Sequence, residues 1–452
     1  MTVLWTSNDI AAATGGKATA DFSVSGLSID TRSLQPGDLF VPLKDTRDGH
    51  DFIEAAFAAG AAGTLSEYAD TDRAVHVTHV DAALRALGQA GRARSGARRI
   101  AVTGSVGKTS IKDALATILA QLGRTHKSQR SFNNHIGVPI TLATLPPDTD
   151  FAVFETGMNH AGELTDLSHQ VAPHVALITT VAAAHRANFD SVEAIADAKA
   201  EIRHGLLPNG TLILNADNSY TPRIRSLAAG QKIVTFGRAK DSDIRILSSD
   251  HHADGGTVSL DIAGQAITVS LNVAGEHWAS NAAACMAVVN VLGLDLEAAA
   301  RAMQHVTASG GRGDVHALTL SDQAITLIDE SYNANPASMR AAISAAALRP
   351  GRKIAVLGDM HELGPDELDL HAALAEPLVQ AGFSRVLTIG ECMRSLRGAL
   401  PRAMRGLHAD SADQLRDALS DELQAGDVVL LKGSNAAGLG QLVSRLKQEG
   451  AA

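Results

Sequence analysis

The stretch Arg99-Ile100-Ala101-Val102-Thr103-Gly104-Ser105-Val106-Gly107-Lys108-Thr109-Ser110 decides the fold of the central part of this chain. Its first five residues predict a strand, and residues 108–122 predict a helix. The glycines between them allow the backbone to wrap around a phosphate group, whose charge the free amides at the helix start can bind. The sequence therefore predicts a phosphate-binding loop between a strand and a helix.

The polar residues of this loop are of the types that nucleotide phosphates require. Lys108 is expected to reach the β- and γ-phosphates, and the Thr109 hydroxyl is expected to ligate Mg²⁺. The motif is shortened, because Val102 stands where its usual first glycine would be. A plain strand-to-helix turn with a surface lysine is the alternative, which the flanking strand and helix disfavour. The residues expected to bind the nucleotide here are Gly104, Ser105, Gly107, Lys108, Thr109 and Ser110.

A carboxylate is expected at the end of a neighbouring strand to complete a metal site. Glu155 directly follows the apolar run 151–154 and has this position. Mg²⁺ prefers hard oxygen ligands and keeps several waters, so Thr109 and Glu155 would suffice for one ion. Taken without the loop, Glu155 is better explained as a strand-end acid that caps the next helix.

The rest of the central segment alternates between strand-like and helical stretches. This alternation predicts parallel strands with crossover helices, which is a doubly wound α/β sheet. Between residues 243 and 273 apolar and polar residues alternate around glycines, which predicts antiparallel hairpins at the sheet edge. The strand-like runs before these hairpins are 151–154, 175–180, 211–214 and 232–236.

The flanking segments predict two further α/β domains. We expect a small N-terminal domain at 1–97, a central P-loop-type domain at 98–313 and a C-terminal Rossmann-like domain at 314–452. Arg92, Arg94, Arg98 and Arg99 mark the first boundary, and we interpret them as a solvated basic turn. The strand-like runs of the third segment are 324–328, 353–357, 385–389 and 427–431.

Composition excludes several classes of protein. The formal net charge of −10 disfavours a general nucleic-acid surface, and the 3% aromatic content disfavours a single-strand binder. Two cysteines in 452 residues are no disulfide framework, which favours a reducing compartment. No signal-like start and no apolar stretch long enough for a membrane span are found, so we expect a cytoplasmic protein without a membrane partner.

The motifs together resemble those of the Mur ligases, the ATP-dependent amide-forming enzymes of peptidoglycan synthesis. That family has the same shortened loop, and the resemblance implies ATP and Mg²⁺ as cofactors. It extends from about Ser28 to Ser434. The stretches that carry it outside the loop are Asp30-Thr31-Arg32, Asp48-Gly49-His50-Asp51-Phe52, Asn133-Asn134-His135-Ile136-Gly137, Glu155-Thr156-Gly157-Met158-Asn159-His160 and Ala198-Lys199-Ala200-Glu201-Ile202.

The resemblance gives roles to two residues that would otherwise be ordinary. Without the family resemblance, we would interpret His185 as a structural histidine and Lys199 as a solvent-exposed lysine on a helix. The family implies a metal-binding histidine and a carbamylated lysine at these positions. The implied catalytic residues are thus Lys108, Lys199 and His185, and the implied metal ligands are Thr109, Glu155, His185 and Lys199. Arg186-Ala187 replace the Leu-Glu that usually follows the histidine.

Further contacts are implied at both ends of the chain. Asn281, Arg312, Asp329 and Asn333 are expected to contact ATP, although Trp278 and Asn435 stand where the family commonly has Asn and Arg. For Asp48-Gly49-His50 there is an alternative to a substrate-binding role: this residue pattern is also common in ordinary turns. The residues expected to bind the UDP-linked substrate are Thr31, Arg32, Asp48, His50, Asn133 and Asn134.

The blocks Asp329-Glu330-Ser331-Tyr332-Asn333-Ala334-Asn335-Pro336 and Val356-Leu357-Gly358-Asp359-Met360-His361-Glu362-Leu363-Gly364 resemble one branch of the family. That branch joins D-alanyl-D-alanine to UDP-N-acetylmuramoyl-tripeptide through an acyl phosphate, and the family implies a monomer. Rival interpretations are a ligase adding the third amino acid, a folylpolyglutamate synthase, a P-loop switch and a non-catalytic scaffold. The sequence contains no guanine-reading Asn-Lys-x-Asp motif, which disfavours a GTPase.

Overall fold

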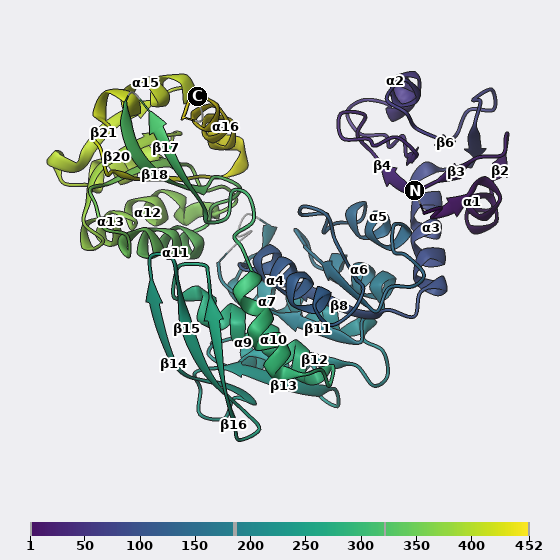
Figure 1. Ribbon diagram of the computed structural model, residues 1–452, viewed down its shortest axis with the longest axis horizontal. Helices are drawn as coiled ribbons and strands as arrows, with labels where there is room; N and C mark the ends of the chain where they lie inside the picture. The colour runs from purple at the N-terminus through teal and green to yellow at the C-terminus, as the bar shows by residue number, and fades with distance from the viewer. Residues whose placement is uncertain (1, 184–187, 321, 451–452) are drawn as a thin grey trace.

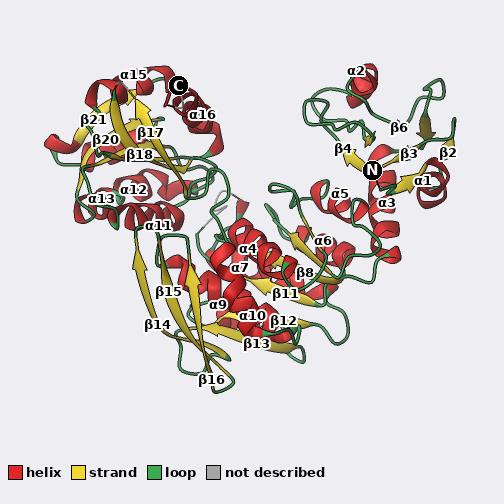
Figure 2. Ribbon diagram, in the orientation of Figure 1, coloured by secondary structure: helices red, strands yellow, loops and turns green. Residues whose placement is uncertain are grey.

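The computed structural model describes residues 2–183, 188–320 and 322–450. Within these residues the strands form sheets of nine, six, five and two strands. Figure 1 shows the N-terminal and C-terminal parts on opposite sides of the central part. Helices flank the main sheets (Figure 2), which confirms the predicted α/β class with three structural parts.

The N-terminal part is built on a mostly parallel sheet in the order β2-β7-β6-β5-β4. Helix α3 packs against this part through an apolar stripe and then leads into the central sheet. Its long axis therefore connects the first two parts (Figure 1). The elements are β1 (Trp5–Thr6), α1 (Ser7–Thr14), β2 (Lys17–Ala18), β3 (Ser23–Val24), β4 (Gly26–Ser28), β5 (Asp38–Phe40), η1 (Gly49–Phe52), α2 (Ile53–Ala58), β6 (Gly63–Ser66), β7 (Ala74–His76) and α3 (Val80–Arg94).

The central sheet has the order β16-β15-β14-β13-β12-β11-β8-β10-β9. β8 lies between β10 and β11 and is parallel to both, so three strand ends meet at the phosphate loop. Strands β14 to β16 are antiparallel, as the sequence predicted. The elements are β8 (Arg98–Thr103), α4 (Lys108–Ala120), β9 (Thr125–Lys127), α5 (Gly137–Ala143), β10 (Phe151–Glu155), α6 (Glu163–Val171), β11 (Val175–Ile178), α7 (Val192–Ala200), η3 (Glu201–Gly205), β12 (Thr211–Asn215), α8 (Thr221–Leu227), β13 (Lys232–Gly237), β14 (Ile244–His252), β15 (Gly255–Ile262), β16 (Gln265–Leu271), α9 (His277–Val291), α10 (Leu296–Ala302) and η4 (Met303–His305).

The C-terminal sheet has the order β17-β18-β22-β19-β20-β21, and only β17 is antiparallel to its neighbour. Four of these strands were predicted, whereas β17 and β21 were not. Both lie at sheet edges and carry charged or histidine residues, so their apolar signal is weak. The elements are β17 (Asp314–Leu320), β18 (Gln323–Glu330), α11 (Pro336–Ala347), β19 (Lys353–Gly358), η5 (Gly364–Asp366), α12 (Glu367–Ala372), α13 (Ala375–Gln380), β20 (Phe383–Ile389), α14 (Met393–Ala399), η6 (Arg402–Met404), β21 (Arg405–Ala409), α15 (Ala412–Glu422), β22 (Val428–Lys432), η7 (Asn435–Ala437) and α16 (Leu439–Gly450).

The arginines at the first boundary do not form a solvated turn, so that interpretation was wrong. Arg94 stacks on Trp5, with its guanidinium carbon 3.4 Å from the ring centroid, and donates to the Leu4 carbonyl. Arg92 and Arg99 donate to carbonyl groups at the end of α6, at 2.6–3.1 Å. Burial lowers the pKa of Arg92, Arg94 and Arg99. These side chains therefore donate to backbone carbonyls at the end of α6 and just before β1 rather than extending into solvent.

Two features connect the central and C-terminal parts. The chain passes between them at Gly311-Arg312-Gly313, where both glycines have positive φ angles, 74° and 95°. Away from this crossing, Arg349 after α11 donates to the Ala253 carbonyl at 2.7 Å and to the Asp254 carboxylate at 3.2 Å. The tip of the β14–β15 hairpin thus lies against the C-terminal part (Figure 1). Among the described residues no helix has the length and apolarity to cross a membrane.

Candidate active site

The phosphate loop has the backbone that its glycines predict. Gly107 has a φ of 86°, and α4 begins at the next residue, so the first amides of the helix point toward the loop. A side chain at Gly104 would place its Cβ 1.9 Å from the Thr179 hydroxyl oxygen. Only glycine fits there, because strand β11 ends directly beside the loop.

Lys108 lies where a phosphate would meet the loop. Its ammonium group donates to the Gly104 carbonyl at 2.7 Å. Burial lowers the pKa of Lys108, an effect that Glu155 opposes and Arg312 reinforces. The ammonium has no carboxylate in direct contact among the described residues, so it is available to an incoming anion.

Glu155 and Thr109 are brought together as the sequence predicted. The Thr109 hydroxyl donates to one carboxylate oxygen of Glu155 at 2.8 Å, and the Asn133 amide donates to the other at 2.8 Å. Glu155 is almost completely buried. Both of these hydrogen-bond donors are neutral groups, and among the described residues no cationic side chain contacts the carboxylate. A hydroxyl and a carboxylate at the phosphate loop are hard oxygen donors and fit a Mg²⁺ ion.

Lys199 is buried near the end of α7 and has a different environment from an exposed helix lysine. Only 2% of the residue is exposed, and within the described residues no carboxylate or hydrogen-bond acceptor contacts its amine. Burial lowers the pKa of Lys199 well below its ordinary value, and the nearby charge of Lys108 lowers it further. His185, which was expected beside it, lies outside the described residues.

A cavity of about 580 Å³ lies between the central and C-terminal parts, over the phosphate loop. The central part contributes the loop, Glu155 and Asn133, and the C-terminal part contributes the turn after β18. The structure therefore brings residues from distant sequence segments together around one cleft. The sequence-predicted residues that line it are Ser105, Gly107, Lys108, Thr109, Ser110, Asn133, Glu155, Asn281, Arg312 and Asn333.

Asp329 does not line this cleft, although the sequence suggested that it contacts the nucleotide. One of its carboxylate oxygens accepts hydrogen bonds from the Ser331 hydroxyl at 2.6 Å and the Ser331 amide at 3.1 Å. Successive residues of a strand point to opposite faces, so the neighbouring Glu330 faces the cleft instead. The sequence prediction chose Asp329 in this segment, whereas the carboxylate that lines the cavity is that of Glu330.

Lys432 is a second residue of the cleft that had no role in the sequence prediction. It is buried at the end of β22 and donates to Glu330 at 3.0 Å and to the Asn333 carbonyl at 2.9 Å. β18 and β22 are adjacent and parallel, which brings these strand ends together. The pairing of these strands is the signal that would have identified Lys432, and it is not visible in sequence.

Arg312 reaches the cleft from the crossing between the two parts. Its guanidinium lies 4.2 Å from the ring centroid of Tyr332 and donates to the Ser131 hydroxyl at 3.3 Å. It therefore contacts residues of both parts at once. Tyr332, His277 and Asn335 also line the cleft and were not predicted as site residues.

The other predicted substrate residues lie outside this cleft. Asn134 accepts from the Gly137 amide at 2.9 Å and so organises the start of α5. Arg32 is exposed and pairs with Asp30 at 2.6 Å, and Thr31 lies between them. All of these contacts are local.

Asp48 and His50 form a compact network in the N-terminal part. His50 is buried, with its Nδ1 2.6 Å from Asp48, and its Nε2 accepts from the Glu67 amide at 3.1 Å. The hydrogen bonds to His50 hold the pKa of Asp48 at about 2, so Asp48 is an anion at neutral pH. Tyr68 donates to the other oxygen of Asp48 and is half exposed. His50 therefore positions the loop that presents Asp48 and Tyr68.

The two described departures from the family pattern have different surroundings. Trp278 is buried among the apolar residues of α9 and the central core, and it does not line the cleft. Asn435 is exposed at the start of η7. Arg186 and Ala187 lie outside the described residues.

Comparisons with known proteins agree with this geometry. Residues 102–289 match a family model of the Mur ligase middle domain, and residues 311–435 match one of the Mur ligase, glutamate ligase domain. The chain is 36% identical over 441 residues to a protein of Escherichia coli (strain K12), with 95% of each chain covered. The chain therefore belongs to the Mur ligase family.

The particular relatives share one name. The Escherichia coli protein and one from Bacillus subtilis (strain 168), 34% identical with 94% of this chain and 93% of that one covered, are UDP-N-acetylmuramoyl-tripeptide–D-alanyl-D-alanine ligases. A crystal structure of MurF from Acinetobacter baumannii has a TM-score of 0.85 and 28% identity, covering 98% of this chain and 99% of that one. These similarities confirm the family recognised from the motifs.

Proposed function

We propose that this chain is the ATP-dependent ligase that joins UDP-N-acetylmuramoyl-tripeptide to D-alanyl-D-alanine in peptidoglycan precursor synthesis. The observation that carries the proposal is the cleft in which the phosphate loop, the buried Glu155 and the C-terminal strand ends meet. Full-length similarity to ligases of this name supports the choice of substrates. A ligase that adds the third amino acid would have the same phosphate loop. The two functions are therefore distinguished by which UDP-linked peptide and which amine the enzyme accepts.

Amide synthesis requires activation of the tripeptide carboxylate. The carboxylate oxygen attacks the γ-phosphorus of ATP, ADP leaves, and an acyl phosphate forms. The amine of the dipeptide then attacks the acyl carbon, and the amide forms as inorganic phosphate leaves and the amine loses a proton. Lys108 and the helix amides hold the transferred phosphoryl group and stabilise the charge that develops on it.

The metal and nucleotide contacts follow from the positions of the side chains. Thr109 and Glu155 would hold Mg²⁺, which when bound neutralises phosphate charge. Arg312 is placed to contact the phosphates from the crossing between the two parts, and Asn281 and Asn333 to contact the rest of the nucleotide. Glu330 takes the place proposed earlier for Asp329, because it is the carboxylate that lines the cleft.

Lys199 has the environment that carbamylation requires. Only a neutral amine attacks CO₂, and burial without a counter-ion favours the neutral form. The product is an anion with two hard oxygens, which suits Mg²⁺ and the neighbouring charge of Lys108. On the basis of the family motif, we propose that the carbamate of Lys199 would hold a second Mg²⁺ ion and that His185 would be its nitrogen ligand.

The remaining assignments complete the proposal. The three main sheets support domains at 1–97, 98–313 and 314–452. Thr31, Arg32, Asp48 and His50 belong to the N-terminal domain, to which we assign the UDP end, and Asn133 and Asn134 to the muramoyl-peptide side. Two cysteines without a disulfide support a cytoplasmic location, and we propose a monomer as the functional unit.

Phosphate release from ATP tests this proposal. The purified protein with Mg²⁺ is given UDP-N-acetylmuramoyl-tripeptide and D-alanyl-D-alanine separately and together, and the product is analysed by mass spectrometry. We expect release that requires both substrates and forms the pentapeptide. Release only with the UDP-linked dipeptide and a single amino acid would assign the preceding step instead. No release with any combination would contradict a ligase function.

A further inference from the structure

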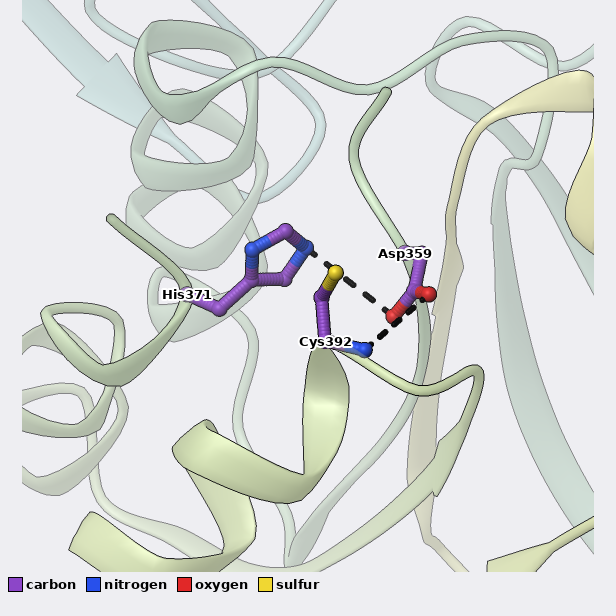
Figure 3. Close-up of side chains that lie close together, drawn as sticks. All are labelled: Asp359, His371 and Cys392. Carbon is purple, nitrogen blue, oxygen red and sulfur yellow. Dashed lines mark hydrogen bonds and ion pairs between the residues drawn. The ribbon is translucent and has the colours of Figure 1, made fainter. Parts of the chain in front are cut away.

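One polar cluster outside the cleft is already satisfied by the fold. Figure 3 shows Asp359, His371 and Cys392 close together in the C-terminal part. Nε2 of His371 accepts from the Met360 amide at 2.9 Å, and the two Asp359 oxygens accept from backbone amides at the start of α14, at 2.8 and 3.2 Å. The Cys392 thiol is hydrogen-bonded to Glu367. These groups therefore hold the loops around α14 together and leave no position for a ligand.

Arg130 has an exposed guanidinium that the fold leaves without a partner. Within residues 2–183, 188–320 and 322–450 no hydrogen bond, ion pair or ring contact reaches it. Arg94, Arg312 and Arg349, which also lie at junctions between the parts, all donate to protein groups. A free arginine on a surface is ordinary by itself, so the backbone of Arg130 and its position decide whether a ligand meets it.

The backbone of Arg130 has a conformation that favours glycine. Its φ angle is 47°. The Phe132 amide donates to the Gln129 carbonyl at 3.0 Å, so residues 129–132 form a tight turn with Arg130 as its second residue. Turns with a positive φ at this place usually have Gly, Asn or Asp there, and a longer side chain strains the backbone. The chain therefore keeps a long basic side chain where the turn itself would be more stable with glycine.

This turn is fixed to the elements that form the phosphate site. The buried Lys112 of α4, the helix that follows the phosphate loop, donates to the Arg130 carbonyl at 2.6 Å. Ser131, the next residue, lines the cleft and accepts from Arg312 at 3.3 Å. The position from which the Arg130 side chain extends is therefore set by the phosphate-loop helix and by a residue of the cleft.

The charge of Arg130 also acts on the N-terminal domain. Hydrogen bonds from Arg32, and then the positive charge of Arg130, lower the pKa of Asp30 to about 2. The guanidinium of Arg130 is therefore near the turn at 30–32, which belongs to the domain assigned to the UDP end. Since its backbone neighbour Ser131 lines the cleft, Arg130 lies between that domain and the phosphate site.

We propose that Arg130 is a substrate-binding residue that holds an oxyanion of the UDP-linked peptide between the N-terminal domain and the cleft. This inference rests on the proposed function. The substrate is an extended anion, with a diphosphate next to uridine and carboxylates on its peptide, and its reacting carboxylate must reach the phosphate held by Lys108. A planar guanidinium donates two parallel hydrogen bonds to a phosphate or a carboxylate. A role for the side chain explains why the turn keeps a strained arginine.

Calorimetric binding of UDP-N-acetylmuramoyl-tripeptide tests this role, with Mg²⁺ and a non-hydrolysable ATP analogue present and D-alanyl-D-alanine omitted. Arg130→Gly relieves the turn and removes the side chain, so its Tm should not fall below that of the wild-type protein. Its Kd for the UDP-linked peptide should rise about 10- to 100-fold, the range for lost hydrogen bonds to a charged group. Arg130→Gln keeps the strain, loses the charge and should bind as weakly. The affinity of both variants for the ATP analogue should be unchanged.

Arg73→Gly is the matched control. Arg73 is also exposed, has a φ of 46°, and its carbonyl accepts from the Thr64 amide at 3.0 Å. It lies at the amino ends of the parallel strands β6 and β7, whereas the contact between Asp48 and Tyr68 lies beyond the carboxyl end of β6. Arg73→Gly should therefore retain the wild-type affinity for the UDP-linked peptide. A loss equal to that of Arg130→Gly would assign the effect to the backbone change and overturn the proposal.

UDP-N-acetylglucosamine distinguishes the two kinds of oxyanion, because it has the diphosphate but no carboxylate. Weaker binding of this ligand by Arg130→Gln assigns the contact to the diphosphate, and weaker binding of the tripeptide alone assigns it to a peptide carboxylate. In either case, added NaCl should weaken binding more in the wild-type protein than in Arg130→Gln. Wild-type affinity in both Arg130 variants, or an equal loss of affinity for the ATP analogue, would overturn the inference. A wild-type protein that binds no UDP-linked peptide would refute the proposed function, and this inference with it.

Discussion

Lys199 and Lys432 are both buried lysines, but their environments differ. Lys432 donates to Glu330 and to the Asn333 carbonyl, whereas Lys199 has no acceptor among the described residues and has Lys108 nearby. A buried ammonium is stable only when it is paired. The C-terminal domain therefore pairs its buried lysine with a carboxylate and a carbonyl, whereas burial in the central domain lowers the pKa of Lys199 and favours its neutral amine.

The comparison between Lys199 and Lys432 can be tested by substitution, and the largest expected effect is the loss of catalysis when Lys199 is replaced. Lys199→Ala is expected to lower kcat/KM about 10³-fold, the loss seen when one charge-stabilising group is removed from an active site. Because the carbamate would be missing, a short carboxylic acid such as acetate should restore part of the activity. The measurement is phosphate release with both substrates. Lys232→Ala, which changes an exposed lysine on β13, should retain full activity. Full activity of Lys199→Ala without acetate would refute carbamylation.

A smaller effect is expected on the stability of the paired lysine. Lys432→Met removes the ammonium but leaves Glu330 and the Asn333 carbonyl in place. Since Glu330 is partly exposed, we expect a loss of about 2 kcal/mol in the free energy of unfolding, below the 3–5 kcal/mol typical of fully buried pairs. Urea unfolding measures this loss.

Glu330→Gln in the Lys432→Met background serves as the control for that prediction. It removes the unpaired carboxylate and should recover about half of the lost stability. If the double variant is less stable than Lys432→Met alone, the ion pair does not explain the effect.

The smallest effect per measurement point is on the pH dependence of stability, which changes gradually from one pH unit to the next. The pKa of Lys199 is lowered in the folded state, so between that pKa and 10.5 the unfolded state binds more protons. In CO₂-free buffer, stability should therefore rise with pH by up to about 1.4 kcal/mol per unit from this group. Lys199→Met should have a smaller slope than the wild-type protein when urea unfolding is repeated from pH 7 to 9.5. Equal slopes would mean that Lys199 remains charged after folding.

The sequence was most informative where function depends on local geometry. The phosphate loop needs glycines, a lysine and a hydroxyl within a few residues, and all are adjacent in the chain. Glu155 could be predicted because a carboxylate directly after a buried strand lies at the sheet end where that loop lies. The α/β class and the antiparallel hairpins followed from apolar periodicity alone.

The sequence was less informative where strand pairing decides the environment. Glu330 and Asp329 are neighbours, and which one enters the cleft depends on the strand face. Lys432 became a site residue only through the contact between β22 and β18. The boundary arginines were wrongly taken as solvated because their carbonyl partners are distant in sequence; those of Arg92 and Arg99 come from the end of α6, some 70 residues away. Composition cannot reveal such partners, whose positions are set by tertiary packing.

The crossing at Gly311-Arg312-Gly313 has a mechanical consequence. Arg312 is the only non-glycine residue of that segment, and it touches Ser131 on one side and Tyr332 on the other. Rotation about either glycine would move the C-terminal domain and would separate the guanidinium from Ser131 or from Tyr332. We therefore expect a ligand that binds Arg312 to restrict rotation at this crossing, so that ligand binding and the angle between the two domains are coupled.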